Sequence, residues 1–437
     1  MRRTLAGVAG SAALALTLAA CGSGSSDTET DAENTPDQNA DPAAIEGELT
    51  WWDTSDPTNE GPAWKELIQR FNEEYPNVTI NYQSVPFANA QNDFKTAAES
   101  GEGAPDILRA EVAWVPEFAS LGYLYSLEGT ELLAESDDFL ETPMSSNVFD
   151  GETYGVPQVT DTLALMYNKK LFEEAGIEEP PATWDEVKAA ADKLKGIGVD
   201  GIYINSGGYF LLPFIYGEGG DMVDTESQEI VVNSEENVAG IKTAQDLVKS
   251  GAAVKPVAND SYGTMMTLFK EGKVGMIING PWEVANIDGD PKFGGFDNLG
   301  VAPVPAGSAQ SGAPVGGHNW VIWSGMDEAK AEAAVAFVNF MSSAESQAFI
   351  ASELGLLPTR QSAYDLPEVQ DNPKIAAFKT ALDAAVARPW IPEGGQFFGP
   401  LDEMATKVLI QNADVQKSLD EVAKTYKNEV VKDYSLN

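Results

Sequence analysis

Three short polar segments lie next to predicted strands in this sequence, and they contain the side chains best suited to chemistry. The segments are Asp53 to Asp56, Arg109 to Trp114 and Gln158 to Asp161. They combine carboxylates, amides, hydroxyls and an aromatic ring, which together can bind a small polar molecule. Because ligands of open α/β sheets lie beyond the carboxyl ends of the strands, we expect all three segments on one rim.

Few residues on which enzyme active sites depend are present. His318 is the only histidine and Cys21 the only cysteine, so a zinc site of imidazoles or thiolates lacks ligands. The sequence has no Gly-x-Ser-x-Gly elbow and no phosphate-binding loop. A glycosidase uses a pair of carboxylates. Because 68 residues of this chain are acidic, the presence of such a pair is no evidence for a glycosidase. The prediction is a binding protein with no catalytic residue, metal or cofactor, and a secreted glycosidase is the alternative.

Strand and helix patterns alternate along the chain from Glu48 onward. Leu49 to Trp52 predicts a strand, Ala63 to Tyr75 a helix with one apolar face, and Val78 to Tyr82 a second strand. Leu163 to Tyr167 is an apolar run that predicts a buried strand. Alternating strands and helices predict parallel βαβ units, and about 390 residues are enough for two lobes.

The first 47 residues have the features of export and membrane attachment. Met1 to Ala20 contains two arginines and then an apolar run too short for a membrane span, which is typical of a secretory signal peptide. Leu18 to Cys21 resembles a bacterial lipobox, so we expect cleavage before Cys21 and a lipid on its sulfur. Residues 22–47 lack Lys and Arg and have almost no apolar residues, which predicts a disordered tether. The expected location is the outer face of the cell membrane.

The charge of the chain excludes two classes of partner. The formal net charge is −41, from 68 acidic and 27 basic residues. No basic stripe is present to neutralise phosphates, so nucleic acid is not an expected partner. Anionic lipids and anionic polymers are disfavoured as ligands for the same reason.

Several sequence blocks resemble the extracellular solute-binding proteins of sugar ABC importers. They include Tyr154-Gly155-Val156-Pro157, Tyr167-Asn168-Lys169, Thr183-Trp184-Asp185-Glu186, Gly280-Pro281-Trp282 and Gly316-Gly317-His318-Asn319-Trp320. Val85-Pro86-Phe87, Tyr216-Gly217-Glu218-Gly219-Gly220 and Arg388-Pro389-Trp390-Ile391 are most similar to actinobacterial maltose- and maltodextrin-binding lipoproteins. Together these blocks span nearly all of the chain after the tether.

The resemblance implies an α/β, two-lobe periplasmic-binding-protein fold of type II, similar to that of maltose-binding proteins. Three interlobe crossovers are expected near Val159, Val315 and Pro367. The N-terminal lobe would comprise residues 48–158 and 319–367, and the C-terminal lobe residues 159–318 and 368–437. The lobes would close about a hinge on the ligand. A monomer of this kind would deliver the ligand to ABC permease subunits in the membrane.

The resemblance also implies the ligand and the residues that bind it. A sugar presents hydroxyls on its rim and C–H groups on its ring faces, which suit carboxylates and aromatic rings respectively. Trp282 is the expected stacking residue, Asp161 the expected carboxylate, and His318 is interpreted as lining or supporting a crossover. The other expected ligand-binding residues are Tyr209, Glu111, Trp114, Asp53, Asp56 and Phe398. The expected ligand is a maltose- or maltodextrin-type α-gluco-oligosaccharide in the interlobe cleft; another oligosaccharide class, a peptide or a metal are the alternatives.

Overall fold

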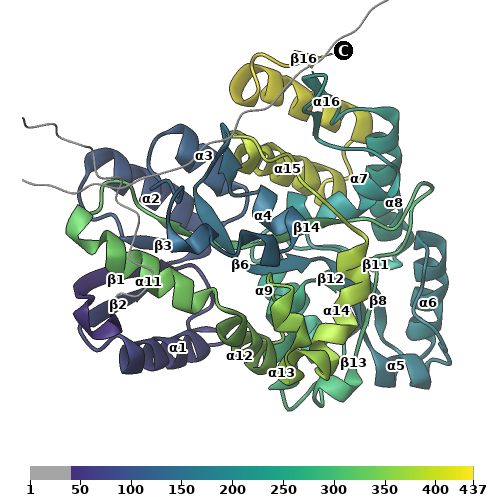
Figure 1. The fold of residues 1–437 in the computed structure, drawn as a ribbon. Helices are drawn as coiled ribbons and strands as arrows, with labels where there is room; N and C mark the ends of the chain where they lie inside the picture. The colour runs from purple at the N-terminus through teal and green to yellow at the C-terminus, as the bar shows by residue number, and fades with distance from the viewer. Residues whose placement is uncertain (1–40, 437) are drawn as a thin grey trace, which may run out of the picture. The chain divides into compact units, whose positions relative to one another are not determined.

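The computed structural model describes residues 41–436, and two larger β-sheets, of six and five strands, organise this part of the chain (Figure 1). The predicted signal peptide, Cys21 and most of the predicted tether lie outside the described residues. The tether prediction is wrong for its last residues. Ile45 is buried in a hydrophobic core, and the first strand already begins at Gly47. An apolar isoleucine next to a strand stabilises this segment against the body of the protein.

The first sheet contains three parallel strands joined by helices, as the alternating pattern predicts. Its order is β15-β14-β3-β1-β2, and β6 also pairs with β14. β14, much later in the chain, runs antiparallel to β3 and β6, so the sheet is mixed. The elements are β1 (Gly47–Asp53), α1 (Gly61–Glu74), β2 (Val78–Ser84), α2 (Phe87–Ser100), β3 (Ile107–Glu111), β6 (Gly155–Thr162), β14 (Ala313–Ile322) and β15 (Ala385–Val386).

The core beside the first sheet is aromatic. Helix α1 buries Trp64, Leu67, Ile68 and Phe71, which confirms the predicted apolar face. Figure 1 shows α1 and α11 (Ala331–Met341) next to strands β1 and β2. The aromatic rings of Trp51, on β1, and Trp64, on α1, pack edge to face. This dense packing gives the strand ends beyond β1 and β3 a rigid support.

The second sheet has the order β11-β8-β12-β7-β13, with β7 antiparallel to both of its neighbours. The predicted capping box is present at α6, where the Thr183 hydroxyl accepts from the Glu186 amide and the Glu186 carboxylate accepts from the Ala182 amide. The elements are β7 (Ala164–Asn168), α6 (Trp184–Gly196), β8 (Asp200–Tyr203), α8 (Glu235–Ser250), β11 (Ala253–Val254), α9 (Ser261–Lys270), β12 (Val274–Asn279) and β13 (Leu299–Ala302).

The chain passes between the two sheets at three places. It leaves the first sheet at the end of β6 and enters β7 after the single residue Leu163. It returns between β13 and β14, and it crosses again along α12 (Ala344–Leu354). In α12, Ile350 belongs to the core of the first sheet and Ala351 to that of the second. Because α12 contacts both cores, it does not mark where one lobe ends and the other begins. The predicted lobe boundaries therefore stay a prediction.

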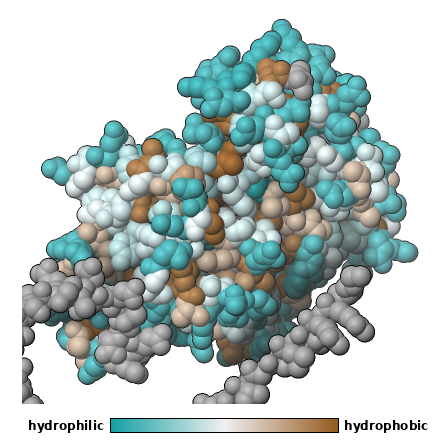
Figure 2. Space-filling model, turned by 45° about the horizontal axis from the view of Figure 1, so that its top comes forward, coloured by the Kyte–Doolittle hydropathy of each residue, from teal (hydrophilic) through white to brown (hydrophobic). Residues whose placement is uncertain are grey.

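The face drawn in Figure 2 is mostly hydrophilic, and its hydrophobic residues form small separate groups. None of the helices in residues 41–436 combines the length and apolar character that a membrane span requires.

Candidate functional site

Arg109 on β3 connects the three polar segments at the strand ends. Its Nε donates to Oε1 of Gln158 at 2.7 Å, and its Nη1 lies 3.3 Å from the hydroxyl of Thr54. Its guanidinium also lies 3.4 Å from the Glu60 carboxylate and 3.9 Å from that of Asp53. The structure therefore brings Thr54, after β1, together with Arg109 and Gln158, but these two lie within β3 and β6 and not beyond the strand ends, so the common rim stays a prediction.

Two carboxylates, those of Glu60 and Asp53, share this one buried arginine. Burial raises the pKa of Glu60 to about 7, although Arg109 acts in the opposite direction. Asp53 accepts a 2.7 Å hydrogen bond from the hydroxyl of Tyr82 and another from the hydroxyl of Ser55. Asp53 is fully buried, so its carboxylate stabilises this segment through these hydrogen bonds.

Arg388 is the centre of a second cluster, which contains four of the predicted site residues. Its guanidinium forms an ion pair with Glu111, and its Nε donates to the carbonyl of Val315 at 3.0 Å. The rings of Tyr209 and Phe398 both lie 5.6 Å from the guanidinium carbon. The ring of Trp390 lies 5.5 Å away, so the guanidinium packs against three aromatic rings and pairs with one carboxylate.

Asp161 is the carboxylate of this cluster that lies on the crossover strand β6. It is 8% exposed and forms a hydrogen bond with the hydroxyl of Tyr209. Burial raises the pKa of Asp161 to about 7, and Arg388 and Glu111 act on it with opposite signs. A Cβ on Gly316 would lie 2.2 Å from Oδ1 of Asp161, so only glycine fits there.

Trp282 follows β12 in a short 3₁₀ turn, Pro281–Glu283. Its indole Nε1 donates to the hydroxyl of Tyr262 at 2.7 Å, and its carbonyl accepts from the Asn59 side chain at 3.1 Å. A Cβ on Gly280 would lie 1.9 Å from the indole ring, because the ring folds back over this residue. Trp282 is partly buried and packs against the cores of both sheets. Trp282 thus lies between the two cores, where we expect a ring that stacks on a ligand.

Trp114 and Asp56 have different surroundings from those of the other predicted site residues. Trp114 is only 5% exposed and stacks on Phe87 at 5.1 Å, while Phe87 is 48% exposed. The aromatic face open to solvent is therefore that of Phe87, which the sequence analysis did not assign to the site. Asp56 is exposed and accepts hydrogen bonds from the amides of Thr58 and Asn59. Partial burial acts to raise the pKa of Asp56, but the hydrogen bonds to it outweigh this effect and lower the pKa.

The sequence analysis missed Arg109, Arg388 and Tyr262 as site residues. The Arg388-Pro389-Trp390 block was a usable signal for one of them, since a buried arginine beside aromatic residues is a common ligand-binding arrangement. His318 pairs with Glu111 and Val159 in the sheet, so it lines the crossover as interpreted. Burial, with both arginines nearby, lowers the pKa of His318, and the imidazole is neutral at pH 7.

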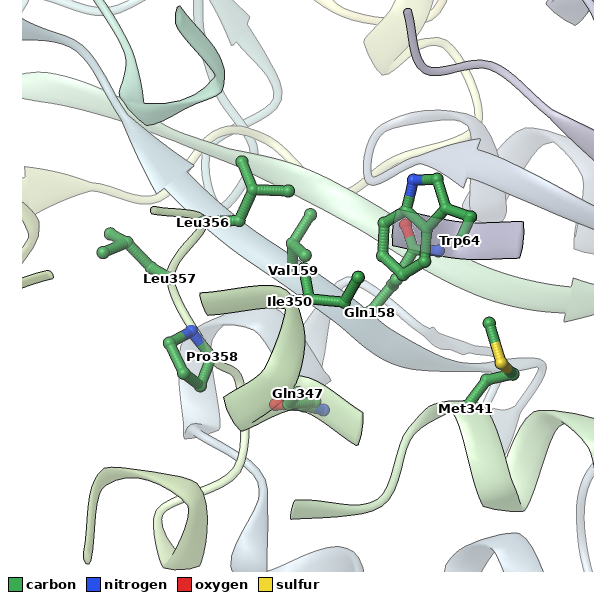
Figure 3. Close-up of a pocket in the computed structure, with 9 residues that line it drawn as sticks. All are labelled: Trp64, Gln158, Val159, Met341, Gln347, Ile350, Leu356, Leu357 and Pro358. Carbon is green, nitrogen blue, oxygen red and sulfur yellow. The ribbon is translucent and has the colours of Figure 1, made fainter. Parts of the chain in front are cut away.

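Two cavities in the described part of the chain border these clusters, at Gln158 and at Val315, but neither is lined by a predicted ligand-binding residue. Figure 3 shows a cavity of about 10 Å³ beside Trp64 and Gln158, which has room for one water molecule. A larger cavity of about 410 Å³ lies beside Thr160 and Val315, and it contains none of the predicted ligand-binding residues. Its volume alone does not make it the site, because the convergent carboxylates and aromatic rings lie at the strand ends.

The two sheets, the crossovers between them and the polar clusters at the strand ends define a two-lobed solute-binding protein. The chain belongs to the family of bacterial extracellular solute-binding proteins, whose sequence profile matches residues 66–377. Membership of this family confirms the resemblance and the two-lobe fold predicted from the sequence. It also makes the protein a binder of solutes and not an enzyme.

Individual relatives differ in the ligands for which they are named. The GacH receptor of Streptomyces glaucescens, solved unliganded and with acarbose, is 42% identical with a TM-score of 0.86, over 90% of this chain and 100% of that chain. The maltotriose-binding protein of Pyrococcus abyssi is 28% identical over 88% of this chain and 82% of its own length. The diacetylchitobiose binding protein DasA of Streptomyces coelicolor is 26% identical over 90% of each.

Proposed function

We propose that the protein captures a maltose- or maltodextrin-type α-gluco-oligosaccharide between its two lobes and delivers it to the membrane subunits of an ABC importer. The arrangement around Arg388 is the observation that carries this proposal. Tyr209 and Phe398 provide aromatic faces, and Asp161 and Glu111 provide carboxylates, within one cluster. A sugar needs both kinds of partner, because its ring faces are apolar and its rim carries hydroxyls.

Trp282 supplies a further aromatic face and the exposed Asp56 a further carboxyl group, whereas the fully buried Asp53 acts on the site only through its hydrogen bonds with Tyr82 and Ser55. The carboxylates accept hydrogen bonds from sugar hydroxyls, and the neutral, uncharged character of a gluco-oligosaccharide suits a protein with a net charge of −41. The relatives named for maltotriose and acarbose support the α-glucan class. The relative named for diacetylchitobiose makes an N-acetylated oligosaccharide the second candidate.

The mechanism of capture follows from contacts that join segments of the two sheets. The Asn59 side chain, after β1, donates to the carbonyl of Trp282, after β12. Glu111, at the end of β3, is paired with Arg388. A ligand that contacts groups of both lobes binds the closed arrangement more tightly than an open one, so it shifts the population toward closure. The closed form is the one that the permease would recognise.

The N-terminal segment adds a proposed location. A lipid on Cys21 would hold a monomeric protein at the outer face of the cell membrane, with residues 22–40 as part of the connecting tether. One acyl chain binds a membrane only weakly, so the mature protein would carry more than one.

A screen of ligands tests this proposal. The melting temperature is measured with maltose, maltotriose, acarbose, cellobiose and diacetylchitobiose, because a ligand of the folded state stabilises it by mass action. We expect the largest increase with maltotriose or a longer α-glucan and none with cellobiose. An increase with diacetylchitobiose alone would replace the α-glucan by the second candidate. No increase with any of these sugars would contradict a function in oligosaccharide capture.

A further inference from the structure

The hydroxyl of Tyr262, on α9, lies at the N–H edge of the indole ring of Trp282. Its hydroxyl accepts the indole N–H at 2.7 Å and donates to Oε1 of Glu283 at 2.6 Å. The other carboxylate oxygen of Glu283 accepts from Nδ2 of Asn286 at 2.7 Å. Hydrogen bonds therefore run in one direction, from indole to phenol to carboxylate. Each donor in this series of hydrogen bonds has an acceptor, so the series favours one orientation of the indole and phenol rings.

The burial of Glu283 makes this series of hydrogen bonds hard to rearrange. Glu283 is 8% exposed, so its carboxylate needs the donors that surround it. Tyr262 and Asn286 supply two of them, and the Tyr262 ring packs 6.0 Å from that of Phe210. The phenol is thus held at both ends, by a buried acid and by an aromatic neighbour. Its hydroxyl presents a fixed acceptor to the indole N–H.

An indole ring that stacks on a ligand gains from being fixed before the ligand arrives. Trp282 is only partly buried, so packing alone leaves its ring some freedom of rotation. A hydrogen bond to the indole nitrogen removes this freedom in the ligand-free protein, and the ligand then loses less entropy on binding. The same bond directs the polar edge of the indole toward the protein, which leaves its apolar face for a sugar ring.

We propose that Tyr262 is a positioning residue for ligand binding, because its hydroxyl holds the indole ring of Trp282 in the orientation that stacks on the sugar. This inference rests on the proposed function and on Trp282 as a contact of the ligand. It assigns to Tyr262 no contact with the sugar itself. A purely structural role would instead affect the folding of the second lobe without acting through Trp282.

A double-mutant cycle separates these two roles. The variants are Tyr262→Phe, Trp282→Ala and the double variant, and the Kd for maltotriose is measured by calorimetry after each has been shown to melt cooperatively. Tyr364→Phe is the matched control, since its hydroxyl also donates a single bond, to the Pro358 carbonyl at 3.0 Å, and makes no contact with Trp282 in the structure. Mutations of residues that act through one another are not additive.

We expect Tyr262→Phe to raise the Kd about three- to tenfold, which is the usual effect of losing one hydrogen bond, here the one that holds the indole; loss of the bond to Glu283 should affect stability instead. In the Trp282→Ala background the same change should have no further effect, and Tyr364→Phe should leave the Kd unchanged. An unchanged Kd for Tyr262→Phe, or an equal effect with and without the Trp282 ring, would overturn the inference alone. A normal Kd for Trp282→Ala would show that both this inference and the proposed site are wrong.

Discussion

Replacement of Asp161 by asparagine probes the site through both stability and binding. Asparagine keeps the size of the side chain and an oxygen that can accept from the Tyr209 hydroxyl, but it removes the ionisable group. Asp161 is 8% exposed, and the charges nearest to it are those of Arg388, Glu111 and Arg109. The substitution therefore removes a buried negative charge with little change in packing.

The expected change in stability follows from the pKa of Asp161, which burial raises from 3.8 to about 7. The folded protein then holds this proton more tightly than the unfolded chain. The contribution of Asp161 to the free energy of unfolding is complete below pH 4 and is lost as the pH rises to about 7. A pKa change of about three corresponds to at most about 4 kcal/mol. Asp161→Asn should thus flatten this part of the pH profile and be the more stable protein at pH 8.

The expected change in binding has the opposite sign. A hydrogen bond from a sugar hydroxyl to a carboxylate contributes about 1.5–3 kcal/mol, so Asp161→Asn should raise the Kd for maltotriose about 10- to 100-fold at pH 8. Urea unfolding followed by circular dichroism at pH 5 and pH 8 measures stability, and calorimetric titration measures the Kd. A variant that is more stable but binds less tightly is typical of a binding residue placed at a cost to the fold.

Asp221→Asn is a matched control for this experiment. Burial raises the pKa of Asp221 to about 6, and its carboxylate accepts from the Met222 amide and makes no hydrogen bond or ion pair with Arg388, Glu111 or Tyr209. The control should flatten the stability profile between pH 4 and pH 6 and leave the Kd unchanged. If Asp161→Asn is instead less stable at pH 8 and binds maltotriose normally, then Asp161 is a structural hydrogen-bonding group and our reasoning about it fails.

Four further substitutions, one of them a control, test other parts of the proposal. Trp282→Ala should raise the Kd about 10- to 100-fold and destabilise the ligand-free protein by about 1–2 kcal/mol, because this ring is only partly buried. Trp184→Ala, at a buried ring in the second lobe, should lower the free energy of unfolding by about 3–5 kcal/mol and leave the affinity of the folded fraction normal. If unfolding and titration data show this pattern for Trp282→Ala instead, Trp282 is a core residue. Asn59→Ala removes the bond to the Trp282 carbonyl and should weaken binding about two- to tenfold by calorimetry, whereas an unchanged Kd would exclude this bond from closure. Cys21→Ala should release the protein from the membrane with unchanged ligand binding; an unlipidated Cys21 in mass spectra of the membrane form would disprove the anchor.

Local sequence patterns determined the elements of this fold and led to the rim on which we propose the site. The spacing of Trp64, Leu67, Ile68 and Phe71 predicts the buried face of α1, since a helix turns every 3.6 residues. Polar residues at the ends of predicted strands indicated the common rim, because parallel strands end at one edge. These features depend on neighbours within about ten residues, so sequence periodicity contains the information needed to find them.

Only the tertiary structure decided which polar groups meet. Glu111 and Arg388 are separated by 277 positions, and Asn59 and Trp282 by 223. Trp114 and Phe87 both follow strands, yet packing buries the first ring beneath the second and leaves Phe87 exposed. The raised pKa of Asp161 likewise depends on burial by segments far away in the chain. Such pairings are set by how whole sheets and helices pack, and no local pattern contains the identity of a partner two hundred residues away.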